Sequence, residues 1–269
     1  MTGRIFSVVG AMFLLTVCSK GDQRNTASAA TRSDDTAAAT PPPAPGMATP
    51  TTSAAGGTIT GKVKFTGTAP RNPAIDMTEE AVCKAKYTST PTEENVVAGP
   101  ANALANVFVY VKAGLPAGAS YPAPSTPVTL DQNGCRYHPH VLGIQVGQAL
   151  NIMNSDPLLH NIKAKAVKNR PFNVSQPNVT ATPTVRTFNA PEVMIALECN
   201  VHGWMNAWLG VLPHPFFAVT GSDGSFSIKG LPPGTYTIEA WHEKYGTQTA
   251  TVTVTGTETK TSDLTFAAR

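Results

Sequence analysis

One short segment late in the sequence carries a thiol, an imidazole and a thioether in the spacing C-x2-H-x2-M, at Cys199, His202 and Met205. It follows directly on the apolar run Val193–Leu197, which is short and partly branched and therefore predicts a buried strand. Soft sulfur ligands together with imidazole favour copper over hard cations. Two His and one Cys in a trigonal set, with a weak axial Met, form the ligand arrangement of electron-transfer copper sites. The segment therefore predicts a copper loop that lacks one His.

The missing His is expected from a different strand. Residues 147–162 read as turn, strand, polar turn, His and strand, with the strand Leu150–Asn154 before the turn and His160 after it. Taken together, the two segments resemble the cupredoxin family (plastocyanin and azurin), in which the first His ligand follows such a turn and is itself followed by Asn, here Asn161. The C-x2-H-x2-M loop is most similar to that of amicyanin. The resemblance implies one type 1 copper held by His160, Cys199, His202 and Met205.

The cupredoxin resemblance covers about a third of the chain, and we predict a cupredoxin domain at residues 114–213. It implies a Greek-key β-sandwich in which both His bind through Nδ1. It also implies that His202 lies nearest the surface and is the exit route for electrons. Glu198 stands where the family often has an aromatic residue, so hydrogen bonding around the sulfur, and with it the redox potential, is expected to differ.

A second resemblance lies after the copper loop. The segments D-G-S-F-S-I, G-L-P-P-G-T-Y-T-I and T-V-T-V, within residues 223–254, resemble the carboxypeptidase regulatory-like domain, a transthyretin-like sandwich related to carbohydrate-binding folds. The opening strands of that family are similar to residues 57–67 and 107–111, before the copper segments. We therefore predict an all-β chain in which residues 57–113 and 214–269 form one split sandwich around the cupredoxin domain. Three modules in simple succession remain the alternative.

The N-terminal part predicts export. Residues 1–20 read as a signal peptide, with Arg4 before an apolar stretch too short to span a bilayer. Its end, Leu15–Cys18, resembles a bacterial lipoprotein signal and implies lipidation of Cys18; a secretory signal cut near Ala29 is the alternative. Residues 21–56 are rich in Ala, Thr, Ser and Pro and predict a disordered tether. We expect a membrane-anchored protein in the periplasm or on the outer cell surface.

Four cysteines require assignment, at positions 18, 83, 135 and 199. With Cys18 lipidated, a disulfide between Cys83 and Cys135 leaves Cys199 as a free thiol, which a metal would protect in an oxidising compartment. The alternative pairs Cys199 with Cys83 or Cys135 and makes His202 and Met205 ordinary residues.

Among the remaining histidines, His138 and His140 are expected to have a structural or surface role and His214 a structural one. His242 and Glu243 are expected to be solvated loop residues, with a second polar site as the alternative. A net charge of +3 without a basic cluster excludes nucleic acid as a partner, and no nucleophile–base pair indicates an enzyme. The leading hypothesis is an electron carrier that meets a periplasmic or membrane redox protein. Copper storage is one alternative. A carbohydrate-binding surface protein is another, with Tyr236, Trp241 and Tyr245 as the candidate sugar platform.

Overall fold

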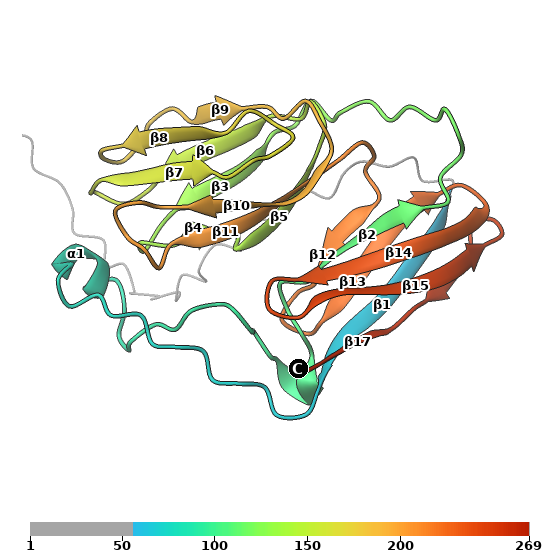
Figure 1. Ribbon diagram of the computed structural model, residues 1–269, viewed down its shortest axis with the longest axis horizontal. Coiled ribbons are helices and arrows are strands. Elements are labelled where there is room, and N and C mark those ends of the chain that lie inside the picture. Colours follow the sequence, from blue (N-terminus) through green and yellow to red (C-terminus); the bar gives the residue numbers. More distant parts are fainter. Residues whose placement is uncertain (1–55, 269) are drawn as a thin grey trace, which may run out of the picture. The chain divides into compact units, whose positions relative to one another are not determined.

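The computed structural model describes residues 56–268 (Figure 1). The predicted signal peptide, the lipid anchor at Cys18 and the tether up to residue 55 lie outside this part. Within residues 56–268, no helix combines the length and apolar character needed to cross a bilayer. Strands dominate this part of the chain, and its helices are a single turn of α-helix, α1 (Ala81–Lys84), and a 3-10 turn at Pro100–Asn102. The predicted all-β class is confirmed.

The middle of the chain forms a two-sheet sandwich, here called the metal-site sandwich (residues 128–212). One sheet has the strand order β4-β3-β6-β9 and the other the order β5-β11-β10-β7-β8 (Figure 1). Buried and part-exposed residues alternate in β6, so that one face of the strand turns to the core between the sheets. The strands are β3 (Val128–Gln132), β4 (Tyr137–His138), β5 (Val141–Gln145), β6 (Leu150–Asn154), β7 (His160–Ala164), β8 (Phe172–Gln176), β9 (Thr184–Arg186), β10 (Glu192–Glu198) and β11 (Asn206–Leu212).

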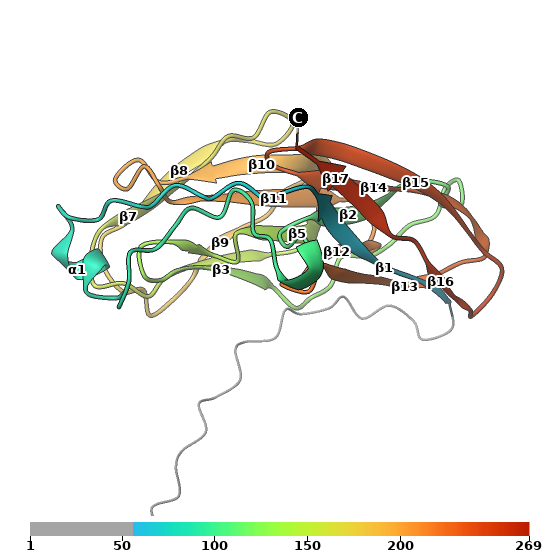
Figure 2. The ribbon, with the colours of Figure 1, turned by 90° about the horizontal axis from the view of Figure 1, so that it is seen from below.

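A second sandwich, the split sandwich, combines strands from both sides of the first in sequence. β1 pairs antiparallel with β13 and parallel with β16 and β17 (Figure 2), and β2 lies between β12 and β14. Each sheet thus contains one early strand and several late ones. The boundaries 57–113, 114–213 and 214–269 remain predictions. The strands are β1 (Gly57–Thr66), β2 (Phe108–Ala113), β12 (Phe217–Val219), β13 (Ser225–Leu231), β14 (Gly234–His242), β15 (Gly246–Val254), β16 (Thr259–Thr261) and β17 (Leu264–Ala267).

The two sandwiches meet through a small apolar cluster. Phe108 of β2 is fully buried in it, against Val141 of β5 and Leu212 of β11. Gly210 makes room for this ring, because a Cβ at Gly210 would lie 2.5 Å from the Phe108 side chain. Polar contacts surround the cluster: the Glu243 carboxylate accepts a hydrogen bond from Trp208 Nε1 at 3.0 Å and lies 2.7 Å from His140 Nε2.

A long connection between β1 and β2 packs on the metal-site sandwich. We call residues 73–93 the Cys83 loop. Its base is closed by backbone hydrogen bonds from Ile75 N to Pro91 O, 2.8 Å, and from Glu93 N to Pro73 O, 2.9 Å. Ile75, Met77 and Cys83 enter the core of the metal-site sandwich. The Cys83–Cys135 disulfide joins the loop to the turn before β4.

Several elements were not predicted. Helix α1 holds only four residues, and strand β8 has no fully buried position before Gln176, so neither has a strong apolar pattern. Strands β16 and β17 are short and follow a run of polar residues. Strand β9 is three residues long and has no buried position.

Candidate metal centre

The four predicted ligands lie at one end of the five-stranded sheet, where its strands begin or end. His160 is the first residue of β7, while Cys199 follows the last residue of the neighbouring strand β10. These strands run antiparallel, so the start of one lies beside the end of the other. The loop Cys199–Met205 is closed by backbone hydrogen bonds from Cys199 N to Met205 O, 3.1 Å, and from Met205 N to His202 O, 2.9 Å. The loop geometry is thus fixed by its own backbone.

The structure brings three donor atoms together. His160 Nδ1 lies 3.0 Å from His202 Nδ1, and Cys199 Sγ lies 4.0 Å from His202 Nδ1. One donor atom from each of these residues falls within 4.8 Å of the others, and all three side chains are buried. Met205 is 1% exposed and packs in the same core cluster as Cys199.

The Cys199 sulfur is held in a setting that favours the thiolate. Burial alone would raise the pKa of Cys199, but hydrogen bonding with His160, His202 and backbone N–H groups outweighs burial and lowers the pKa to about 5. One of these donors is His202 N, 3.4 Å from the sulfur. The thiolate is the form that binds a metal.

Asp156 supports the imidazole of His160 from the side away from Cys199. Its Oδ2 lies 2.9 Å from His160 Nε2, and both side chains are fully buried. Gly134 N and Cys135 N donate to the same carboxylate, and Lys86 Nζ lies 3.1 Å from it. Burial would raise the pKa of Asp156, but these donors hold the pKa well below its usual range. Burial likewise would lower the pKa of His160, yet Asp156 and Cys199 raise it.

Asn161 braces the sulfur side of the centre. Its Oδ1 accepts a hydrogen bond from Asn200 N at 2.7 Å and lies 3.3 Å from Cys199 Sγ. Its Nδ2 donates to Asn173 Oδ1 in β8 at 2.6 Å. The sequence pointed to Asn161 and to the turn that contains Asp156 only as parts of a motif. Their roles depend on partners from other strands.

The donor set fits copper. Two imidazole Nδ1 atoms, a low-pKa thiol and the thioether of Met205 in the same loop are the kinds of ligand that Cu(I) and Cu(II) share in electron-transfer sites. No carboxylate belongs to the His160–Cys199–His202 group among the described residues, so this group offers soft donors and not the acidic oxygens that hard cations prefer.

The disulfide leaves Cys199 as the free thiol. Cys83 and Cys135 are bonded to each other, and Cys199 is the free cysteine among residues 56–268. The alternative pairing of Cys199 with either partner is therefore not formed. The disulfide also borders the site, because Cys83 lies near His202 and Cys135 near His160 in two further donor groups.

His202 is not near the surface, contrary to the expectation from the cupredoxin resemblance. It is 1% exposed, compared with 5% for Cys199. The Cys83 loop is the reason: Glu80 Oε1 lies 3.7 Å from His202 Nε2, and the Cys83 sulfur belongs to the same group of neighbouring donors. Sequence reasoning missed Glu80, which carries no local motif.

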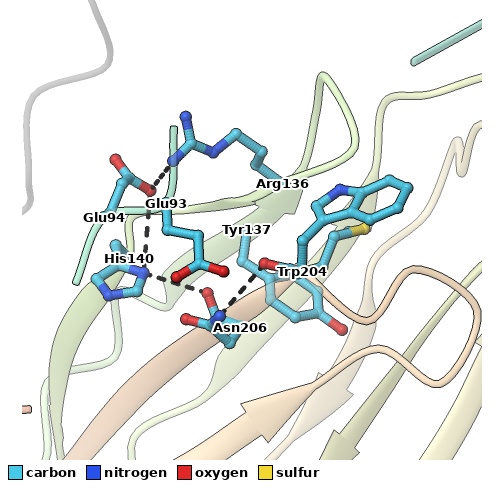
Figure 3. Close-up of a pocket in the computed structure, with 8 residues that line it drawn as sticks. Glu93, Glu94, Arg136, Tyr137, His140, Trp204 and Asn206 are labelled. Carbon is cyan, nitrogen blue, oxygen red and sulfur yellow. Dashed lines mark hydrogen bonds and ion pairs between the residues drawn. The ribbon is translucent and has the colours of Figure 1, made fainter. Parts of the chain in front are cut away.

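A small polar pocket lies next to Met205 and Trp204 (Figure 3). Its groups are largely paired: Glu94 with Arg136 at 3.0 Å, and His140 Nδ1 with Asn206 O at 3.2 Å. Trp204 Nε1 donates to Cys135 O at 3.0 Å, which ties the ligand loop to the disulfide turn.

His214 belongs to the scaffold as predicted, whereas the prediction of a solvated loop residue is wrong for His242, which ends strand β14 and is 2% exposed. His214 Nε2 lies 3.0 Å from Val111 O, and His242 Nδ1 accepts from Lys244 N at 3.1 Å. The proposed sugar platform is not an exposed row. Tyr236 is fully buried, and Trp241 packs on Trp208 with ring centroids 5.1 Å apart. Tyr245 packs on Phe65 with ring centroids 4.9 Å apart.

Different parts of the chain are similar to different known proteins. Residues 214–268 match the family model of the carboxypeptidase regulatory-like domain. A search of curated proteins finds no match. Among solved structures, the M98A mutant of amicyanin matches 38% of this chain and 97% of its own, at 17% identity and a TM-score of 0.28.

Two further solved structures are similar over part of the chain. A purple cupredoxin from Nitrosopumilus maritimus covers 31% of this chain and 97% of its own, at 22% identity and a TM-score of 0.26. A Cu-containing nitrite reductase from Thermus scotoductus covers 37% of this chain, at 23% identity and a TM-score of 0.30. Only 25% of the reductase is matched. Similarity at this level transfers no ligand set to this chain.

Proposed function

We propose that this chain is an exported type 1 copper protein that carries single electrons, with copper held by His160, Cys199, His202 and Met205. The observation that supports it is the buried group of two imidazoles and one low-pKa thiol within 4.8 Å of one another. Copper bound there would supply a one-electron couple between Cu(I) and Cu(II). In this proposal the chain is a carrier and not an enzyme.

In this proposal the polypeptide assists electron transfer by holding the ligands in a fixed geometry. Asp156 fixes the ring of His160, and Asn161 fixes the backbone beside Cys199 through Asn200 N. The ligand loop is further tied to Cys135 O by Trp204. A site that keeps its geometry in both oxidation states changes little on electron transfer, so fast exchange follows from rigidity.

The proposed partner is a periplasmic or membrane redox protein that docks over the metal centre. We propose three exposed apolar side chains as candidate contacts for this partner, each adjacent in sequence to a residue of the centre or of its border: Val82, Leu159 and Val201. We further propose that a lipid on Cys18 anchors the chain to a bacterial membrane and that residues 21–56 give it reach.

The deciding experiment is the visible spectrum of the purified chain loaded with Cu(II). We expect an intense thiolate-to-copper band that ascorbate bleaches and an oxidant restores. The variant Cys199→Ser should lose the band, because the sulfur supplies the charge-transfer electron. Glu198→Gln is the matched control: it changes the adjacent residue, which pairs with Lys165 at 2.8 Å, and should keep the band.

Two results would contradict the proposal. One is a colourless protein that binds no Cu(II) at stoichiometric concentration. The other is copper binding with the same spectrum in the wild type and in Cys199→Ser, which would place the metal elsewhere.

A further inference from the structure

The two ligand imidazoles each face a carboxylate on the side away from the metal position. Their Nδ1 atoms point toward each other at 3.0 Å. His160 Nε2 faces Asp156 Oδ2 at 2.9 Å, and His202 Nε2 faces Glu80 Oε1 at 3.7 Å. The first carboxylate belongs to the metal-site sandwich, whereas Glu80 belongs to the Cys83 loop, from an earlier part of the chain.

His202 Nε2 lacks the close hydrogen-bond partner that His160 Nε2 has. It is a buried side-chain nitrogen that has no hydrogen-bond partner within residues 56–268. A buried polar group without a partner carries a desolvation cost, so the site is expected to supply a partner in its working state. Glu80 Oε1 is the acceptor that the structure places closest to meeting this need.

Metal binding creates the need for that partner. Without metal, the 3.0 Å contact between the two Nδ1 atoms requires one proton between them. If both Nδ1 atoms were to bind a metal, the Nδ1 hydrogen would move to Nε2 of the same ring, so that each neutral imidazole would carry its hydrogen on Nε2. For His160 the acceptor is already in place at Asp156. For His202 it has to be Glu80.

We propose that Glu80 is the positioning residue for the copper ligand His202, accepting a hydrogen bond from its Nε2–H when Nδ1 binds the metal. The inference rests on the proposed copper site. The disulfide places Glu80, because Cys83 follows it by one helical turn and is bonded to Cys135. The Cys83 loop is then part of the metal centre, and the ring of His202 is oriented by protein instead of by solvent.

The test compares Glu80→Ala and Glu80→Gln with the wild-type chain, and Glu79→Ala serves as a control on the neighbouring exposed carboxylate. Cu(I) affinity is measured by competition with a chromophoric Cu(I) chelator. We expect Glu80→Ala to bind Cu(I) about tenfold or more weakly, as for other partners of metal-bound His. Glu80→Gln keeps an acceptor oxygen and should restore most of the affinity, and Glu79→Ala should match the wild type.

A second readout follows the proton itself. In the Cu(I) protein, which is diamagnetic, NMR should detect His202 Nε2–H in slow exchange with water in the wild type and in Glu80→Gln, and in fast exchange in Glu80→Ala. Rapid exchange in the wild type, or unchanged Cu(I) affinity in Glu80→Ala, overturns the inference. A wild type that binds no copper overturns the proposed function and this inference together, whereas a blue wild type with an indifferent Glu80→Ala overturns the inference alone.

Discussion

At the scale of single residues, only some of the residues on which the candidate centre depends can be recognised from the sequence. Cys199, His202 and Met205 stand in one loop, so their spacing alone brings them together. Asp156 and Glu80 act on the two imidazoles from separate segments. Three of the four proposed ligands are therefore local in sequence, while His160 and the orientation of both imidazoles depend on tertiary structure.

Met205 is predicted to influence the reduction potential of the site but not to be required for its thiolate-to-copper band. Met205→Leu removes a weak thioether donor that stabilises Cu(II) more than Cu(I), so the reduction potential should rise while the thiolate-to-copper band remains. Met205→Gln supplies an oxygen donor and should lower the potential. Spectroelectrochemical titration of the three proteins measures both shifts, and an unchanged potential in both variants would show that Met205 is not a ligand.

His214 is predicted to make stability depend on pH. Burial lowers its pKa to about 4, although the hydrogen bond to Val111 O opposes the shift. The unfolded chain binds this proton near pH 6.5 and the folded chain only near pH 4, so stability is complete above 6.5 and falls as the pH drops between them. The loss approaches about 3 kcal/mol.

Urea denaturation at pH 4.5 and 7.5 measures this dependence. His214→Gln should reduce the difference between the two pH values by most of that amount, since the titrating group is gone. His138→Gln, at an exposed position, serves as the control and should keep the full difference. Equal pH dependence in all three proteins would exclude His214 as the cause.

At the scale of elements, the Cys83 loop is held by one covalent bond and several polar contacts. The disulfide joins residues 52 positions apart. Tyr87 OH donates to Gly134 O at 2.7 Å, and Arg136 Nη2 to Thr92 O at 2.9 Å. The loop therefore has little regular structure of its own and takes its shape from the sandwich beneath it.

Removing the disulfide is predicted to destabilise the fold. For a closed loop of this length, loss of the cross-link is expected to cost about 4 kcal/mol, through the larger entropy of the unfolded chain. The double variant Cys83→Ala/Cys135→Ala should show this in its urea midpoint with an unaltered far-UV spectrum. Wild-type protein unfolded in the presence of a dithiol reductant should behave in the same way, and an unchanged midpoint in both would refute the prediction.

Elements with a strong apolar pattern could be predicted, and those that depend on neighbours could not. Buried and part-exposed residues alternate in the run Leu150–Asn154, which forms β6. The run Val193–Leu197 is apolar throughout and forms most of β10. Strand β8 is mostly part-exposed and exists because its backbone pairs with β7. The depth of His202 was also missed, because the loop that covers it comes from a segment with no pattern of its own.

At the scale of the whole molecule, the two sandwiches are joined by close packing around Phe108. Its ring lies over Gly210 and Gly143, where the absence of Cβ atoms lets the two backbones approach. His140 and Trp208 of one sandwich share Glu243 of the other. The sandwiches are expected to unfold together.

Gly210→Ala is predicted to weaken this junction. Its Cβ would meet Phe108 at 2.5 Å, and such overpacking typically costs about 1–3 kcal/mol. Calorimetry should show a lower melting temperature and a separation into two transitions as the sandwiches uncouple. Gly256→Ala is the matched control, because nothing lies within 4 Å of its added Cβ, and a single unshifted transition in Gly210→Ala would argue against the coupling.

The pairing of β1 with β13, β16 and β17 has a consequence for how the chain is made. During synthesis β1 emerges early and has no partner strand until the last part of the polypeptide follows. The nine strands of the metal-site sandwich pair only with one another, so they can fold while β1 is still unpaired. A chain whose middle part folds first leaves the edge of β1 unpaired and exposed in the interim, and this interval is when a holdase chaperone would have most to do.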